Sequence, residues 1–142
     1  MAKKKIIVSF DFENDKAYKL VLNMWNANPN FEFEFADLTP DEIKSNDISR
    51  IKAALTAKIN KSSYTLVIVG QNANSVHKDS KLIGYKNWIN FEIAKSKEKG
   101  NKIVAVKLNK ANQSPDELLN SGASWAMSFT QESILKALED VQ

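Results

Sequence analysis

A glutamate on the apolar side of a predicted helix is the feature of this sequence that could do chemistry. Residues 87–95 predict a helix, on which Glu92 lies about 40° from Trp88, between Trp88 and Ile89 at about 100°. Burying a carboxylate costs several kcal/mol unless it is paired or has a chemical task. Glu92 is therefore either functional or a glutamate at the edge of the apolar stripe, hydrogen-bonded to a backbone amide or paired with a lysine.

One reaction class needs only a single buried carboxylate. When a ribosyl C–N bond is cleaved and the leaving group is already cationic, as nicotinamide is in NAD⁺, the departing ring becomes neutral and no general acid is required. Positive charge develops on the ribose, and one carboxylate beside it can stabilise that charge or form a covalent adduct. Glu92 could support this reaction without a second acid, a cysteine or a metal.

The composition restricts the other chemistries that the chain could support. It contains no cysteine, which excludes disulfides, thiolate nucleophiles and cysteine-based zinc sites. It also contains a single histidine, His77, which cannot form a two-histidine metal site. We therefore expect no metal and no cofactor, and the lack of cysteine fits a cytoplasmic protein best.

Length and charge predict one ordinary domain over residues 1–142. The chain is 43% hydrophobic and 26% charged, a typical globular composition. No apolar run approaches the roughly 18 residues of a membrane span, and the apolar run after the basic N-terminus is too short for a secretory signal. The net charge of +3 is spread over many lysines, so we expect a solvated helix face and not a nucleic-acid-binding surface.

The hydrophobic patterns predict five strands that alternate with helices. Three strands are apolar throughout and two alternate between apolar and polar residues: 5–10, 64–69 and 102–108 are apolar, and 31–35 and 124–129 alternate. Right-handed crossovers between such strands give a parallel sheet covered by helices on both faces. A strand with one polar face suits the edge of a sheet, so we predict the order 2-1-3-4-5, a flavodoxin-like three-layer α/β fold.

Capping residues predict where several helices begin. Asn14 or Asp15 can cap the first helix, and Asp47 lies at the start of the second. Residues 114–117 are typical of a capping box that opens a short helix, and residues 133–141 predict the last helix.

In this fold the ligand crevice lies beyond the carboxyl ends of strands one and three. Two segments converge there: residues 9–14 follow strand one, and residues 71–92 follow strand three. The second segment begins with a loop of about fifteen residues, a length that is usually functional or mobile in compact domains. Glu92 is therefore predicted to lie where this fold binds its ligands, which favours a functional role.

Three other functions of this fold do not fit the two segments. A phosphate-accepting receiver needs an aspartate at the end of strand three, where this chain has Val69 and Gly70. A flavin phosphate loop needs small and hydroxyl residues after strand one, and the dinucleotide-binding glycine fingerprint and the P-loop are missing from the sequence. Asp11, Glu13 and Asp15 are interpreted as helix-start charges and not as a metal site.

Three stretches carry a family resemblance: residues 7–15 (IVSFDFEND), residues 59–70 (INKSSYTLVIVG) and residues 88–93 (WINFEI). Together they resemble the TIR-like family of bacterial and archaeal proteins, and within it the TIR proteins of the Thoeris antiphage system. The resemblance covers most of the chain and weakens after Leu108. Its most specific element is the Trp-x-x-x-Glu spacing at a helix start, where TIR enzymes carry their catalytic glutamate.

The resemblance implies an enzyme of the NAD⁺ nucleosidase or ADP-ribosyl cyclase type. Such proteins release nicotinamide from NAD⁺ and, in Thoeris, make a cyclic ADP-ribose-type signal that activates a separate effector in antiviral defence. Glu92 matches the catalytic glutamate, and Ser9, Phe10 and Asp11 match the stretch that lines the nucleotide pocket. We also expect Trp88 to take part in substrate binding, to pack the start of its helix and to orient Glu92. Burial should raise the pKa of Glu92.

Other parts of the resemblance leave alternatives open. Residues 38–46 correspond to a loop through which TIR domains often associate, so we expect a homo-oligomer. The loop at residues 71–87 looks longer than that of the family, which leaves the roles of Asn74 and Ser75 open, and His77 is interpreted as a loop residue. The chain could also be a non-catalytic TIR-like interaction or nucleotide-sensing module, or an NAD⁺ hydrolase that gives linear ADP-ribose.

Overall fold

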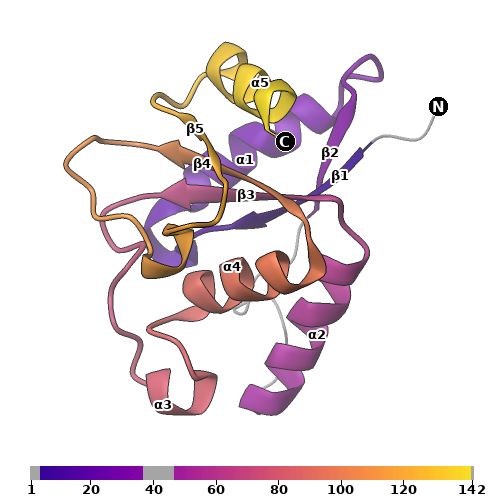
Figure 1. The fold of residues 1–142 in the computed structure, drawn as a ribbon. Helices are drawn as coiled ribbons and strands as arrows, with labels where there is room; N and C mark the ends of the chain where they lie inside the picture. Colours follow the sequence, from indigo (N-terminus) through magenta and orange to yellow (C-terminus); the bar gives the residue numbers. More distant parts are fainter. Residues whose placement is uncertain (1–3, 37–46, 142) are drawn as a thin grey trace.

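Five parallel strands form the central sheet of the protein (Figure 1). The computed structural model describes residues 4–36 and 47–141. The strands are β1 (Lys4–Ser9), β2 (Phe33–Ala36), β3 (Tyr64–Val69), β4 (Lys102–Lys107) and β5 (Ser124–Ala126). Their order in the sheet is β2-β1-β3-β4-β5, so the predicted topology is confirmed.

The two alternating strands lie at the edges of the sheet, as predicted. Along β2, Phe33 and Phe35 are buried while Glu34 is exposed, so one face of the strand points to the core and the other to solvent. On β5, Trp125 is 41% exposed and Ala126 is buried. Every residue of β3 is buried, because this strand has a neighbour on each side and helices over both faces.

Helices cover both faces of the sheet (Figure 1). They are α1 (Phe12–Asn26), α2 (Ile48–Asn60), α3 (Ser80–Ile83), α4 (Trp88–Lys99) and α5 (Gln131–Asp140), with a 3₁₀ turn, η2 (Asp116–Leu118). Leu22 of α1 and Ile134 of α5 pack in the core on one face. Ile89 and Ile93 of α4 pack on the opposite face, and α2 and α3 contact α4 through an apolar cluster that includes Phe91.

The first helix begins earlier than predicted. Neither Asn14 nor Asp15 caps α1, which begins at Phe12. Its cap is Asp11, whose carboxylate accepts a hydrogen bond from the backbone amide of Glu13 at 3.2 Å. The side chain of Asp15 is buried instead.

The predicted capping box at residues 114–117 is also wrong. Only the short turn η2 forms there, and it has no side-chain capping hydrogen bond at its start. Its backbone amides donate to side chains that are distant in sequence. The Asp116 amide donates to Oδ1 of Asn74 at 3.0 Å. Likewise the Glu117 amide donates to Oδ1 of Asn90 at 2.9 Å. Two side chains from other elements thus satisfy amides that a local cap would otherwise have to satisfy.

The C-terminal elements differ from the prediction by a few residues. β5 ends at Ala126 and not at residue 129, and α5 begins at Gln131 with Thr130 as its cap. The predicted start of α2 after Asp47 is confirmed. The predicted association loop at residues 38–46 lies outside the described residues.

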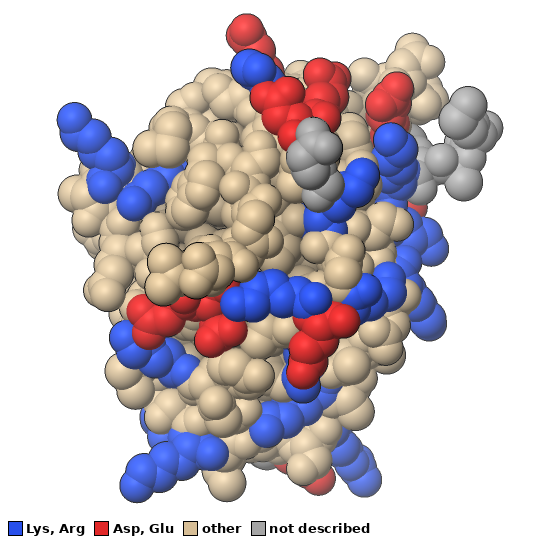
Figure 2. Space-filling view, in the orientation of Figure 1, with Lys and Arg blue, Asp and Glu red and all other residues tan. Residues whose placement is uncertain are grey.

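Basic and acidic side chains are interspersed over the face of the molecule drawn in Figure 2. This mixture is typical of a solvated surface. Within residues 4–36 and 47–141, no helix has both the length and the apolar composition needed to cross a membrane. The same residues contain no cluster of three or more side chains of the types that ligate metals.

Candidate functional site

Glu92 is buried at the first turns of α4, so its predicted orientation is confirmed. Its side chain is 2% exposed, and Oε1 accepts a hydrogen bond from the Ser9 hydroxyl at 3.2 Å. Oε2 is buried and has no hydrogen-bond partner among the described residues. The alternative of a glutamate at the rim of the apolar stripe is wrong, because the carboxyl group lies inside the protein.

Burial raises the pKa of Glu92 from 4.5 to about 8, and the hydrogen bond from Ser9 opposes this shift without cancelling it. The direction agrees with the prediction, because a carboxylate removed from water loses its solvation. At neutral pH Glu92 is therefore mainly protonated when no cation lies beside it. A cation placed beside the carboxyl group would lower this pKa and favour the charged form.

A cavity of about 220 Å³ opens beyond the carboxyl ends of β1 and β3, at the predicted position. Its walls come from residues 10–13 after β1, from residues 72 and 75–77 after β3, and from residues 87–89 at the start of α4. Phe10, Asp11 and Trp88 are among the wall residues. Ser9 and Glu92 are not: Ser9 immediately precedes one wall segment, and Glu92 lies one helical turn beyond another.

Two of the predicted substrate-binding residues also have structural tasks. The carboxylate of Asp11 caps α1 and accepts a hydrogen bond from Nδ2 of Asn14 at 2.6 Å. The indole of Trp88 packs edge-to-face on Phe91, with 5.5 Å between ring centroids. The expected packing of Trp88 at the start of α4 is thus confirmed, and its ring also lies 6.5 Å from that of His77, centroid to centroid.

Asp15 is a second buried carboxyl group, which sequence reasoning missed. It is 6% exposed, and its Oδ2 has no hydrogen-bond partner among the described residues. Burial, and to a smaller extent the charge of Asp11, raises the pKa of Asp15 from 3.8 to about 6. It lies against Gly70 at the end of β3, where a Cβ atom would come within 2.1 Å of Oδ2. Asp15 is seven residues from buried Leu22, so the helical spacing that identified Glu92 would also have identified Asp15.

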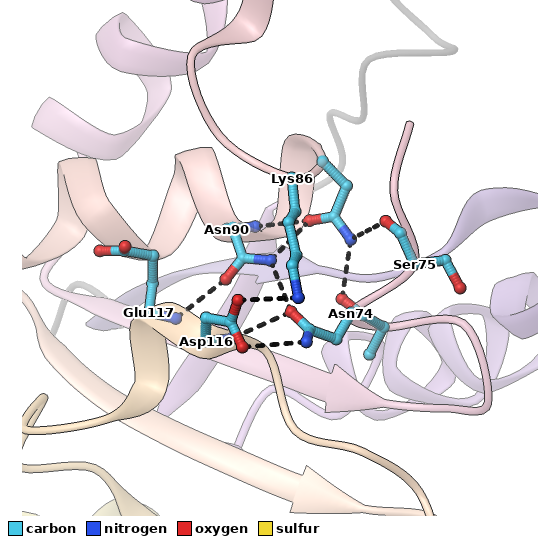
Figure 3. A network of polar contacts seen from close by, with 8 residues as sticks. Asn74, Ser75, Lys86, Asn90, Asp116 and Glu117 are labelled. Atoms are coloured by element: carbon cyan, nitrogen blue, oxygen red, sulfur yellow. Dashed lines mark hydrogen bonds and ion pairs between the residues drawn. The ribbon is translucent and has the colours of Figure 1, made fainter. Parts of the chain in front are cut away.

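A network of amide side chains joins the long loop to the start of α4 (Figure 3). Asn87 caps α4, because its Oδ1 accepts a hydrogen bond from the Asn90 amide at 2.9 Å. Its Nδ2 donates to the carbonyl oxygens of Ala73 and Ser75, both at 2.9 Å. The loop that forms one cavity wall is therefore attached directly to the helix that carries Glu92.

His77 is a wall residue of the cavity and a structural part of the loop. Its Nδ1 accepts a hydrogen bond from the Asp79 amide at 2.9 Å, and its own amide donates to the carbonyl of Lys86 at 2.7 Å. An acceptor role for Nδ1 leaves Nε2 as the nitrogen that carries the proton in the neutral ring. The interpretation of His77 as a loop residue is consistent with these bonds.

Comparison with known proteins gives similarities of several kinds. The family described as "Thoeris protein ThsB, TIR-like domain" matches residues 7–113. The protein named "Putative cyclic ADP-D-ribose synthase ThsB1", from Bacillus cereus (strain MSX-D12), is 30% identical over 112 residues, which are 75% of this chain and 52% of that protein. The chain thus spans about half the length of this curated relative.

Two solved structures are similar to the chain at low sequence identity. A 2-desoxiribosyltransferase from Leishmania mexicana aligns with a TM-score of 0.58 at 11% identity, over 94% of this chain and 95% of that one, which supports the fold alone. The TIR domains of the activated Roq1 resistosome align with a TM-score of 0.47 at 18% identity, over 74% of this chain and 57% of that one. The family match begins in β1, includes Glu92 and ends at residue 113, near the point where the sequence resemblance weakens. The chain belongs to the TIR-like domain family of the Thoeris protein ThsB.

Proposed function

We propose that this domain cleaves NAD⁺, releases nicotinamide and produces a cyclic ADP-ribose-type signal in antiphage defence, with Glu92 as its catalytic residue. The observation that carries the proposal is the buried carboxyl group of Glu92, at the end of the fold where the cavity opens, with one oxygen that has no hydrogen-bond partner in the part of the chain that the structure describes. The name of the Bacillus cereus relative, "Putative cyclic ADP-D-ribose synthase ThsB1", supports the substrate and product class.

In this mechanism the charge of the substrate sets the charge of Glu92. The nicotinamide ring of NAD⁺ is cationic, and its arrival lowers the raised pKa of Glu92, so that a proton leaves and a carboxylate remains. As the C–N bond breaks, positive charge moves from the ring to the ribose, and the carboxylate stabilises it in surroundings of low polarity. The Ser9 hydroxyl, which donates to Oε1, holds the carboxylate in place.

The cavity walls supply the binding contacts. Phe10 and Trp88 offer aromatic surface, and Asp11 is a further wall residue. At about 220 Å³ the cavity is smaller than the roughly 300–1,000 Å³ of a typical ligand pocket, and we propose that it receives the nicotinamide-ribose end of NAD⁺. We propose that the domain acts as a homo-oligomer in the cytoplasm and that its nucleotide product activates a separate effector protein.

Nicotinamide release from NAD⁺ tests the catalytic role of Glu92. Glu92→Gln keeps the size of the side chain and removes its charge, so we expect release to fall at least 100-fold while the melting temperature is unchanged or higher. Glu98→Gln on the same helix is the matched control, since the Glu98 side chain is 64% exposed and pairs with Lys95 at the surface. Equal release by the wild type and Glu92→Gln would refute the proposal.

The product separates this proposal from the alternatives. Chromatography of the reaction should show a cyclic species that precedes or exceeds linear ADP-ribose. Linear ADP-ribose alone would favour a plain NAD⁺ hydrolase. An inactive wild type that still binds NAD⁺ would favour a nucleotide-sensing module, and the assay should therefore be repeated at protein concentrations high enough to drive association.

A further inference from the structure

Three asparagines form one buried cluster beside the cavity, which we call the asparagine hub: Asn74, Asn87 and Asn90. They are 7%, 8% and 1% exposed. Asn90 is at its centre, because its Nδ2 donates to Oδ1 of Asn74 at 3.1 Å and to Oδ1 of Asn87 at 3.0 Å. Its own Oδ1 accepts the Glu117 amide at 2.9 Å. A buried amide with both donors and its acceptor occupied is held in one orientation.

The hub joins three segments that are distant in sequence (Figure 3). Asn74 lies in the loop after β3, Asn90 lies in the first turn of α4, and Asp116 lies in η2. Asn74 and Asp116 bond twice, through the backbone amide and the carboxylate of Asp116, both at 3.0 Å. The second carboxylate oxygen of Asp116 pairs with Lys86 at 2.9 Å, which closes the network at the protein surface.

The same network connects one cavity wall to the helix that carries Glu92. The loop segment held by the hub, residues 73–75, contains the wall residue Ser75, and α4 carries Glu92 one turn beyond Trp88. The hub is thus the polar connection between the part of the protein that would hold a substrate and the part that would react with it. Errors of about 1 Å between such parts can cost roughly 100-fold in rate.

We propose that Asn90 is a positioning residue for this site, which holds the loop wall at residues 73–77 in register with the helix that carries Glu92. The proposal deepens the proposed NAD⁺ cleavage and rests on it for the catalytic consequence. Asn90 does not touch the reacting atoms; it acts through the loop and through α4. Removing its side chain takes one hydrogen-bond partner from each of Asn74, Asn87 and the Glu117 amide. Asn87 keeps its bonds to the carbonyls of Ala73 and Ser75, and Asn74 keeps its bonds to Asp116.

Asn90→Ala tests the proposal, with Asn26→Ala as the matched control. Asn26 also bonds through both ends of its amide, donating to the Phe35 carbonyl at 3.1 Å and accepting from the Phe35 amide at 2.9 Å, but it joins α1 to β2. Amide hydrogen exchange gives a readout that needs no activity. We expect faster exchange at the amides of residues 73–77 and 116–117 in Asn90→Ala and not in Asn26→Ala. Unchanged exchange at these amides in Asn90→Ala would overturn the proposal.

Steady-state kinetics with NAD⁺ tests the catalytic consequence. Per folded molecule, kcat should fall roughly 10- to 100-fold in Asn90→Ala and stay near the wild-type value in Asn26→Ala. Asn74→Ala should reduce kcat in the same way, and the double variant should lose no more than the worse single variant, because both break one network. A normal kcat despite faster loop exchange would also overturn the proposal. If the wild type does not cleave NAD⁺, the proposed function fails, and the coupling of loop and helix is then decided by hydrogen exchange alone.

Discussion

Replacing Glu92 by glutamine should remove most of the pH dependence of stability near neutral pH. In the folded protein the pKa of Glu92 is raised from 4.5 to about 8 by burial, so the folded state binds this proton more tightly than the unfolded chain. Stability is therefore lost as the pH rises between these two values, at about 1.4 kcal/mol per pH unit. From about pH 5 to about pH 8 the loss amounts to roughly 3 to 4 kcal/mol, a large share of the stability of a domain of this size.

Urea unfolding of the wild type and Glu92→Gln at several pH values measures this difference directly. The amide of the variant is neutral throughout, so its free energy of unfolding should lack the Glu92 contribution, and the variant should gain on the wild type as the pH rises. Asp15, whose pKa is raised to about 6, contributes equally to both proteins and cancels in the difference. Parallel curves for the two proteins between about pH 5 and pH 8 would refute the inference that Glu92 titrates in a buried site.

Three further results are expected. Gly70→Ala should destabilise the fold by roughly 1–3 kcal/mol, because its Cβ would come within 2.1 Å of Oδ2 of Asp15. In thermal melts, adding Asp15→Ala to this variant should recover part of the lost stability. If the effects of the two substitutions are simply additive, the contact is contradicted. Trp88→Ala should lower the free energy of unfolding in urea by about 3–5 kcal/mol and should also lower nicotinamide release. Full activity of this variant would contradict a role of Trp88 in the site. Calorimetry in buffers of different ionisation enthalpy should detect nearly one proton released per NAD⁺ bound at neutral pH, because Glu92 is mainly protonated before NAD⁺ binds. If binding releases no proton, the result counts against a buried acid at this position.

The sheet could be predicted from the sequence because its signals are local. A mainly apolar run such as Tyr64–Val69 is typical of a strand covered on both faces, while the alternation along residues 31–35 has one polar face and suits an edge. Capping at η2 and at the start of α1 was predicted less well. In both places several carboxylates or hydroxyls lie within one turn of each other. Contacts with other parts of the fold then determine which of these groups accepts the hydrogen bonds of the helix start.

The candidate site, too, could be predicted only in part. The helical spacing of Trp88 and Glu92 was enough to predict that a carboxyl group is buried, because a helix has a fixed period. The asparagine hub could not be predicted, since asparagines are common in loops and at helix starts for purely local reasons. Only the packing of η2 against α4 brings Glu117 to Asn90 and Asp116 to Asn74.

The burial of Glu92 acts on stability and on the proposed chemistry in opposite directions. The surroundings of Glu92 exclude water and keep its carboxyl group protonated, so that no charge is buried. Because this proton is lost as the pH rises, the free energy of unfolding falls with it. The same surroundings strengthen the attraction between a carboxylate and a ribosyl cation, because less solvent screens the two charges. A surface glutamate such as Glu98, which is 64% exposed, is surrounded by water, and water would weaken its effect on a developing cation. Among residues 4–36 and 47–141, Oε2 of Glu92 has no hydrogen-bond partner. This fits the proposed chemistry, since an oxygen already bonded within the protein would be less available to the reacting sugar.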